Sequence, residues 1–186
     1  MFDFAHLVLH TPRLILRPLR PADAAAVFAL HADREGMRYW ATPPWDDPAL
    51  ADAMIVRDQA ALAAGEHIRL ALERRSDGRL VGLCSLFDFH LASRRAETGY
   101  MLARDCWGAG LMHEALLALL DYGFAVLDLN RVEADIDTRN SASERTLRRL
   151  GFQLEGLLRQ RWIVAGEVSD TGLYGLLRAD WLAQHG

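Results

Sequence analysis

The chain has 186 residues, of which 51% are hydrophobic, and it carries a formal net charge of −4 with no block of like charges. Its length and hydrophobicity favour one globular domain, which we place over residues 1–186. The charge argues against non-specific binding to nucleic acid or to an anionic membrane, so we expect neither partner.

The N-terminal segment does not resemble a targeting signal. Residues 1–10 include Asp3 and lack a basic run, and no apolar stretch approaches membrane-spanning length. Cys84 and Cys106 are the only cysteines and do not form a Cys-x-x-Cys pair. We therefore expect free thiols, no metal site and a cytoplasmic location.

The first third of the chain is expected to form one strand and two helices. These segments are a strand at Arg13–Pro18, an alanine-rich helix from Pro21 to about Ala32, a loop at Gly36–Pro48, and a helix at Ala49–Ala64 that Gly65 ends.

Three strands are expected next. His67–Arg74 and Arg79–Phe87 are joined by Ser76-Asp77-Gly78, which is typical of a hairpin turn. The segment RAETGYML, Arg95–Leu102, is a third long strand.

The segment CWGAGLMHEAL, residues 106–116, places Gly108 and Gly110 just before a helix-forming run. Glycine lets backbone N–H groups approach a ligand closely, and the helix adds its unpaired first N–H groups and positive dipole end. This pattern favours a phosphate site, with a simple tight turn as the alternative. It lacks the third glycine of a dinucleotide fingerprint and the lysine of a P-loop, and His113-Glu114 lacks the second histidine of a zinc motif.

The rest of the chain alternates between helices and strands. From Leu111 the apolar residues recur at helical spacing on one face, at Met112, Leu116, Leu119, Leu120, Phe124 and Leu127. A strand at Arg131–Asp137, a helix at Asn140–Leu150 and two strands within Gln153–Leu177 around Ala165-Gly166-Glu167 complete the chain. The order predicts an α/β fold with a mixed sheet.

The segments RAETGYML, CWGAGLMHEAL and RVEADIDTRNSASERTLRRLGF, in this order, resemble the GNAT superfamily of acyl-CoA N-acyltransferases. The resemblance extends from TPRLILRPL to DTGLYGLLRADW and is greatest to the branch of RimJ/RimL-type ribosomal-protein N-terminal acetyltransferases. It implies a GNAT fold: a central mixed, mostly antiparallel sheet, splayed between two strands and flanked by helices on both faces.

The same resemblance implies acetyl-CoA as cosubstrate. The backbone of residues 107–112 would cradle its pyrophosphate, and the exposed strand end would bind the pantetheine arm and supply an N–H for the oxyanion. Asn140 would hold the pantetheine amide or the strand end. The implied cofactor-binding residues are Met101, Leu102, Ala103, Trp107, Gly108, Ala109, Gly110, Leu111, Met112, Asn140 and Ser143.

For catalysis, the resemblance points to Glu97 as general base, acting directly or through water. The alternative for Glu97 is a solvent-facing or salt-bridged carboxylate beside Arg94 and Arg95. Asp135 and Asp137 rank second, and Asp137 has the alternative of simply ending its strand.

Two catalytic positions of related enzymes are occupied differently here. Trp162 stands where this branch has a catalytic glutamate, and Leu147 stands where many GNAT enzymes have a proton-donating tyrosine. Ser143, in an Asn-x-x-Ser arrangement with Asn140, becomes the candidate donor to the departing thiolate. The pattern of Ser141 to Glu144 also predicts a capping box with Ser141 as N-cap.

The loop residues Tyr39, Trp40, Trp45, Asp46 and Asp47, together with Asp135, are candidates for binding the acceptor. Core packing is the alternative for the tryptophans. We expect an N-acetyltransferase acting on the α-amino group of a protein or peptide, as a monomer or homodimer. A small-molecule amine acceptor (polyamine, amino acid or antibiotic) and a non-catalytic acetyl-CoA-binding module are the alternatives.

Overall fold

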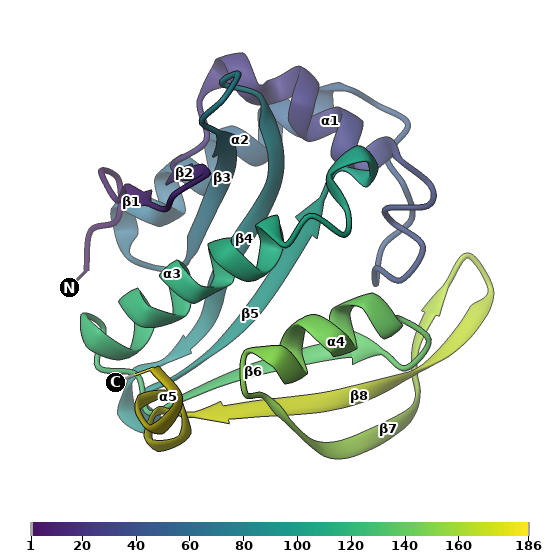
Figure 1. Ribbon diagram of the computed structural model, residues 1–186. Coiled ribbons are helices and arrows are strands. Elements are labelled where there is room, and N and C mark those ends of the chain that lie inside the picture. Colours follow the sequence, from purple (N-terminus) through teal and green to yellow (C-terminus); the bar gives the residue numbers. More distant parts are fainter. Residues whose placement is uncertain (1, 186) are drawn as a thin grey trace.

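An eight-stranded sheet runs through the part of the chain that the computed structural model describes, residues 2–185 (Figure 1). Its strands are β1 (Leu9–His10), β2 (Leu14–Arg17), β3 (Ile68–Arg74), β4 (Leu80–His90), β5 (Arg95–Leu102), β6 (Arg131–Asp137), β7 (Gln153–Val164) and β8 (Glu167–Leu177). The spatial order is β1-β2-β3-β4-β5-β6-β8-β7, and every neighbouring pair is antiparallel except β5 and β6. The predicted mixed, mostly antiparallel sheet is confirmed.

Helices cover both faces of this sheet, as predicted. They are α1 (Ala24–Ala32), α2 (Ala49–Ala64), α3 (Leu111–Ala125), α4 (Ser141–Arg149) and α5 (Arg178–His185). Helix α3 lies on the face that Figure 1 turns to the reader, and α1 and α2 pack on the opposite face through a second apolar cluster.

The main core lies beneath α3. All six residues of the predicted apolar face are buried: Met112, Leu116, Leu119, Leu120, Phe124 and Leu127. Burial of one such side chain contributes about 1.5–3 kcal/mol to the free energy of folding. The six residues of this face together therefore contribute a large part of it. Helix α3 is therefore a rigid support for the glycine turn that precedes it.

One strand and one α-helix were not predicted. The strand β1 has two residues, too few for a periodic pattern, and forms by pairing with Leu16 and Ile15 of β2. Helix α5 follows β8 directly, and its Trp181 packs on Phe124 of α3 at 5.6 Å between ring centroids. Helix α5 thus depends on a contact that is distant in the sequence, whereas β1 pairs with residues five to seven positions further along the chain.

The predicted capping box of α4 is wrong. Asn140 is the N-cap, and its side-chain oxygen accepts the N–H of Ser143 at 3.1 Å. Ser141 is the first helical residue, one position too late to cap. The side chain of Glu144 bonds Arg148 instead of reaching back to the cap.

We expect Asn140→Ala to lower the free energy of unfolding by about 1 kcal/mol, because one first-turn N–H loses its acceptor. Ser141→Ala should change it by less than about 0.5 kcal/mol. Denaturant unfolding of both variants measures the difference. An equal loss for the two would contradict the assignment of Asn140 as the cap.

Candidate active site

The strands β5 and β6 pair for three residues and then separate. Their parallel pairing covers residues 95–97 of β5 and 131–133 of β6. Both strands continue, β5 to Leu102 and β6 to Asp137, and the opening widens between them (Figure 1). The predicted splay of the sheet is confirmed. Backbone groups along its two walls lack a partner strand.

The register of β5 determines which backbone groups face this opening. Ala103 N–H donates to the carbonyl of Val81 on the β4 side at 2.8 Å, and hydrogen-bonded pairs alternate with non-bonded pairs in an antiparallel ladder. Met101 and Ala103 therefore direct their backbone groups toward β4. Those of Tyr100 and Leu102 point into the opening. The free backbone groups of this edge therefore belong to Tyr100 and Leu102, and the cofactor contacts expected at residues 101–103 stay a prediction.

The side chain of Trp107 forms a hydrogen bond with one of these backbone groups. Its indole N–H donates to the carbonyl of Leu102 at 2.7 Å. The N–H of Leu102 and both backbone groups of Tyr100 remain without a partner in the sheet. Trp107, the first residue of the predicted cradle, therefore also stabilises the end of β5.

The turn before α3 presents backbone, as an anion cradle requires. Gly108 and Gly110 have φ values of 74° and 75°, which side-chain-bearing residues rarely adopt. Gly110 is the N-cap of α3, so the N–H groups of residues 111–113 have no partner within the helix. The side chains of Leu111 and Met112 are buried. This geometry fits a pyrophosphate, and the cofactor-binding role of residues 107–112 stays a prediction.

Arg13, which the sequence analysis treated only as a strand start, holds this turn in place. Its Nη1 donates to the carbonyl of Ala109 at 2.8 Å, and its Nε donates to Glu114 at 2.6 Å. Thr11 also donates to Glu114. Although burial opposes ionisation, the hydrogen bonds from Thr11 and Arg13 hold the pKa of Glu114 below its usual value. The guanidinium adds positive charge beside the turn.

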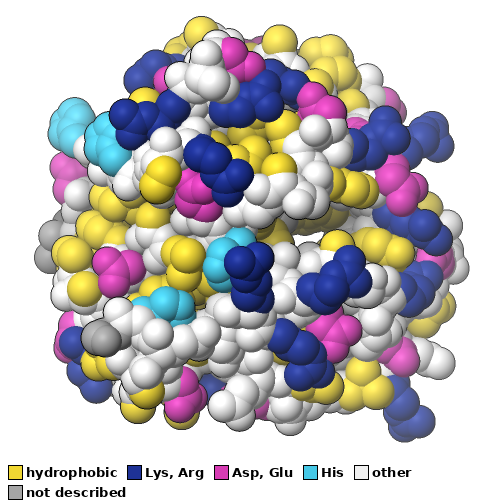
Figure 2. All heavy atoms as spheres, in the orientation of Figure 1, with side chains coloured by type: hydrophobic (Ala, Val, Ile, Leu, Met, Phe, Trp, Pro, Cys, Tyr) yellow, Lys and Arg dark blue, Asp and Glu magenta, His cyan; other side chains and the backbone are white. Residues whose placement is uncertain are grey.

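A cavity of about 530 Å³ connects the opening to the loop between α1 and α2. In the space-filling view a hollow opens on the α3 and α4 side, with arginine side chains along its lower rim (Figure 2). Of the predicted site residues, those that line the cavity are Tyr39, Trp40, Met101, Asp135, Asp137, Asn140 and Ser143. Candidate residues for binding the cofactor and for binding the acceptor thus line the same cavity.

Trp45 lies behind the cavity wall. Its ring stacks on His31 at 4.0 Å, and its backbone N–H donates to the His31 carbonyl at 2.9 Å. Asp47 accepts the N–H of Ala49 at 2.9 Å at the start of α2, and Asp46 is exposed. These contacts agree with the packing alternative for Trp45.

Tyr39 lies between two guanidinium groups. Arg38 and Arg139 are 5.3 and 5.7 Å from its ring centroid. Arg139 also pairs with Asp137 at 2.6 Å and with Glu167. The loop between α1 and α2 is thereby tied to β6 and β8 across the cavity mouth.

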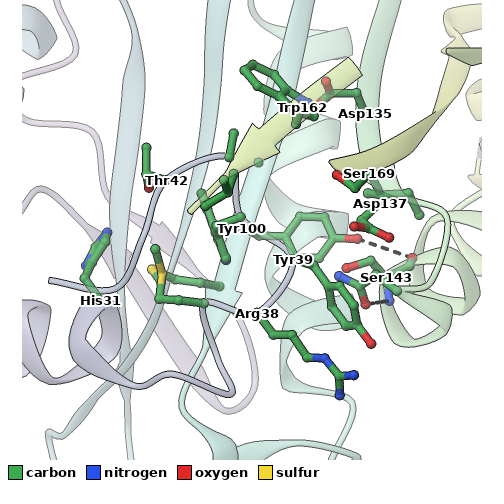
Figure 3. A pocket seen from close by; sticks show the side chains of 18 of the residues that line it. His31, Arg38, Tyr39, Thr42, Tyr100, Asp135, Asp137, Ser143, Trp162 and Ser169 are labelled. Atoms are coloured by element: carbon green, nitrogen blue, oxygen red, sulfur yellow. Dashed lines mark hydrogen bonds between the residues drawn. The ribbon is translucent and has the colours of Figure 1, made fainter. Parts of the chain in front are cut away.

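Tyr100 is a polar side chain at the opening that the sequence analysis did not single out. Its hydroxyl donates to the carbonyl of Ser143 at 3.4 Å, so the β5 wall and α4 meet there (Figure 3). Burial raises the pKa of Tyr100 to about 12, so the hydroxyl keeps its proton at neutral pH. Leu147, one turn after Ser143, is fully buried in the core. In the sequence, the only signal that could have identified Tyr100 as a site residue is its position in an otherwise regular strand.

The candidate bases differ in environment. Burial raises the pKa of Glu97, and the charge of nearby Asp135 raises it further. Glu97 Oε1 is 3.8 Å from Arg95 Nη1. Of the two arginines named in the salt-bridge alternative, Arg95 therefore does pair with Glu97. Glu97 lies where β5 and β6 still pair, beside the cavity rather than in its lining.

Asp137 is a poor proton acceptor. Arg139 binds both of its carboxylate oxygens, at 2.9 and 2.6 Å, and these hydrogen bonds hold the pKa of Asp137 below its usual value. Asp135 is 3.5 Å from the Nε of Arg161.

Cys84 and Cys106 are both free and buried, and burial raises the pKa of each thiol. Burial also lowers the pKa of His113. These shifts disfavour thiolate chemistry. Within residues 2–185, no three His, Cys, Asp or Glu side chains gather as metal ligands, and no helix has the length and apolarity to cross a membrane.

Comparison with known proteins identifies the family. The family model described as "Acetyltransferase (GNAT) domain" matches residues 13–153. The "Uncharacterized N-acetyltransferase YoaA" of Bacillus subtilis is 35% identical over 92% of this chain and 97% of its own. The spermidine N(1)-acetyltransferase of Escherichia coli is 30% identical over 91% and 89% of the two chains. The structure of Mycobacterium smegmatis RimJ in complex with CoA-disulfide superposes with a TM-score of 0.85 at 25% identity, over 99% and 97%.

Proposed function

Because the chain belongs to the GNAT family and is an N-acetyltransferase, we propose that it uses acetyl-CoA to acetylate the α-amino group of a protein or peptide. The family uses acetyl-CoA, which supplies the acetyl group as a thioester. Resemblance to RimJ in fold and sequence supports this choice of acceptor.

The observation that carries the proposal is the pairing of the carboxylates in the cavity. Asp137 and Glu167 pair with Arg139, Asp135 lies 3.5 Å from Arg161, and the hydrogen bonds from Arg139 hold the pKa of Asp137 below its usual value. An α-amino group with pKa near 8 costs only about 1.4 kcal/mol to deprotonate at pH 7, whereas a lysine near 10.4 costs about 4.6. A site whose carboxylates are already paired with arginines therefore suits the α-amino group.

Two sets of groups in this chain would take part in the reaction, one in binding the cosubstrate and the other in proton transfer. The turn of residues 107–112 and the free backbone groups of Tyr100 and Leu102 would bind the cosubstrate. Glu97 would accept the proton of the amine through water, and Ser143 with Tyr100 would hold a proton near the leaving thiol.

A second candidate acceptor is a polyamine. The relative that favours it is the spermidine N(1)-acetyltransferase of E. coli, which matches nearly the whole chain.

Thiol release with acetyl-CoA separates these acceptors. The panel is a peptide with a free α-amine, the same peptide blocked at its N-terminus and carrying one lysine, and spermidine. All 21 basic residues of the chain are arginine, so acetyl-lysine in the reaction can come only from the acceptor. We expect the free α-amine to react fastest. Faster turnover of spermidine would contradict the proposal.

We expect Glu97→Gln to lower kcat/KM and to remove one inflection from its pH profile. The pKa of Glu97 is raised, so its basic form is lost as the pH falls through that raised value. The loss should be greater for a lysine-like acceptor than for an α-amine, since the former needs the base more. Steady-state rates from pH 5 to 9 measure both effects.

Glu133→Gln is the matched control. Glu133 lies opposite Glu97 on β6, but its oxygens are bound by Arg95 and Arg131 at 2.5 and 2.7 Å. It should keep the inflection but shift it to lower pH, because the charge of Glu133 helps to raise the pKa of Glu97. An unchanged profile in Glu97→Gln would move the base to Asp135 or to bulk water.

A further inference from the structure

Arg69 presents a partly free guanidinium to the cavity. Its Nη1 donates to both oxygens of Asp58, at 2.8 and 2.9 Å. Asp58 is fully buried, so this bond fixes the direction of the arginine. Among the described residues, Nε and Nη2 of Arg69 have no hydrogen-bond partner, and the side chain lines the cavity. Two donors with a positive charge are thus available to a ligand.

The charges around Arg69 favour an anionic ligand group. Four arginines line the cavity, Arg34, Arg38, Arg69 and Arg139, against three carboxylates, Asp135, Asp137 and Glu167. The lining therefore has a formal charge of +1 (four minus three), although the whole chain has −4. The carboxylates all have arginine neighbours already. A polycation would find little free negative charge here. Arg69 is also paired, with Asp58, but only through Nη1, so a carboxylate would find its Nε and Nη2 donors free.

Two uncharged side chains from other elements, Thr171 of β8 and His31 of α1, also line the cavity. The Thr171 hydroxyl is buried without a hydrogen bond. His31 bonds the Val27 carbonyl through Nδ1 at 2.8 Å, and burial lowers its pKa, with a smaller effect from the Arg69 charge. A neutral His31 adds no positive charge, and its Nε2 is an acceptor. Buried polar atoms are normally satisfied, so the Thr171 hydroxyl points to a polar ligand in the cavity.

The position of Arg69 sets the size of that ligand. Arg69 pairs with Ser85 across the sheet, and Ser85 pairs with Gly99, which precedes Tyr100. Two strand spacings, about 10 Å, therefore separate the Cα atoms of Arg69 and Gly99. An arginine side chain and an acceptor of one or two amino-acid residues span this distance together.

We propose that the acceptor has a carboxylate within the first two residues of its amino end, bound by Nε and Nη2 of Arg69. This inference rests on the proposed function and narrows its substrate class. The amine lies toward Tyr100 and Ser143, and the carboxylate lies across the cavity on β3. N-termini with an early Asp or Glu residue, or free amino acids, meet this description.

Matched peptides test the inference on the unaltered enzyme. Two pairs of otherwise identical peptides have Glu or Gln at the first or at the second position. A hydrogen bond to a charged group is worth about 1.5–3 kcal/mol, so we expect kcat/KM to be about ten- to a hundredfold higher for Glu in at least one pair. Equal rates, or faster reaction with Gln, in both pairs would overturn the proposal.

Variants of the chain locate the effect. Arg69→Gln should reduce the preference for Glu to within about twofold, and Arg34→Gln, which removes the same charge from the same cavity, should leave it unchanged. Because Arg69→Gln leaves Asp58 buried with one partner fewer, Arg69→Lys serves as a second variant that keeps the charge. It should retain part of the preference. A full preference in a folded Arg69→Gln protein would show that the carboxylate binds elsewhere.

Binding of reaction products gives a readout independent of turnover. N-acetylated Glu peptides should bind more tightly than their Gln counterparts in calorimetry, by about tenfold or more. Tighter binding without turnover on any peptide would support the carboxylate site while contradicting the proposed function. Equal binding of acid and amide would overturn the site itself.

Discussion

Gly110→Val is expected to raise the Kd for acetyl-CoA by about 100-fold or more. The N–H groups at this turn would bind a charged ligand, and each such hydrogen bond is worth about 1.5–3 kcal/mol, so losing two is enough for that change. A Cβ on Gly110 would meet only Arg13 Nη2, at 3.6 Å, which is an ordinary contact. The substitution therefore obstructs the approach of a ligand more than it disturbs the packing of the protein.

The positive φ of Gly110 adds a cost to folding that must be separated from binding. A side-chain-bearing residue at this φ loses about 1–3 kcal/mol of stability. Gly78→Val is the matched control, since Gly78 has φ of 70°, open space around it and a place in the β3–β4 turn. It should lose comparable stability and keep the affinity. Calorimetric titration and thermal unfolding of both variants distinguish the effects, and an unchanged Kd in folded Gly110→Val would place the cradle elsewhere.

Ser143→Ala is expected to lower kcat by ten- to a hundredfold, or about 1.4–2.7 kcal/mol in barrier, with little change in acetyl-CoA affinity. The serine hydroxyl lies in the first turn of α4 at the cavity, where a proton donor to a departing thiol is needed. The N-cap bond to Asn140 uses the backbone of Ser143, so alanine at this position keeps the cap. Stability should therefore be nearly unchanged while the rate falls.

Tyr100→Phe is the companion variant, because the Tyr100 hydroxyl approaches the same turn of α4 from β5. If the two hydroxyls hold the proton together, the double variant should lose little more than the worse single variant. Losses that multiply would assign them separate roles. A Ser143→Ala enzyme with full kcat would exclude Ser143 from the transfer and leave Tyr100 or water as the donor.

Much of the fold follows from patterns that are local in the sequence. The apolar spacing from Met112 to Leu127 predicted the buried face of α3 because one helical turn repeats within four residues. Ser76-Asp77-Gly78 predicted the β3–β4 hairpin, and the positive φ of Gly108 and Gly110 agrees with the expected turn. Such features depend on neighbours along the chain, so the sequence by itself determined them.

Only the tertiary structure decided which polar groups remain free to bind a ligand. Which backbone groups of β5 face the opening depends on its register with β4, and a shift by one residue would exchange Tyr100 and Leu102 for Met101 and Ala103. Asp137 and Glu167 are both occupied by Arg139, which reaches β8 from the end of β6. Charge and hydrogen-bond pairing act over a few ångströms in space, between residues that lie far apart along the chain, so only the folded arrangement determines which groups remain free to bind a substrate.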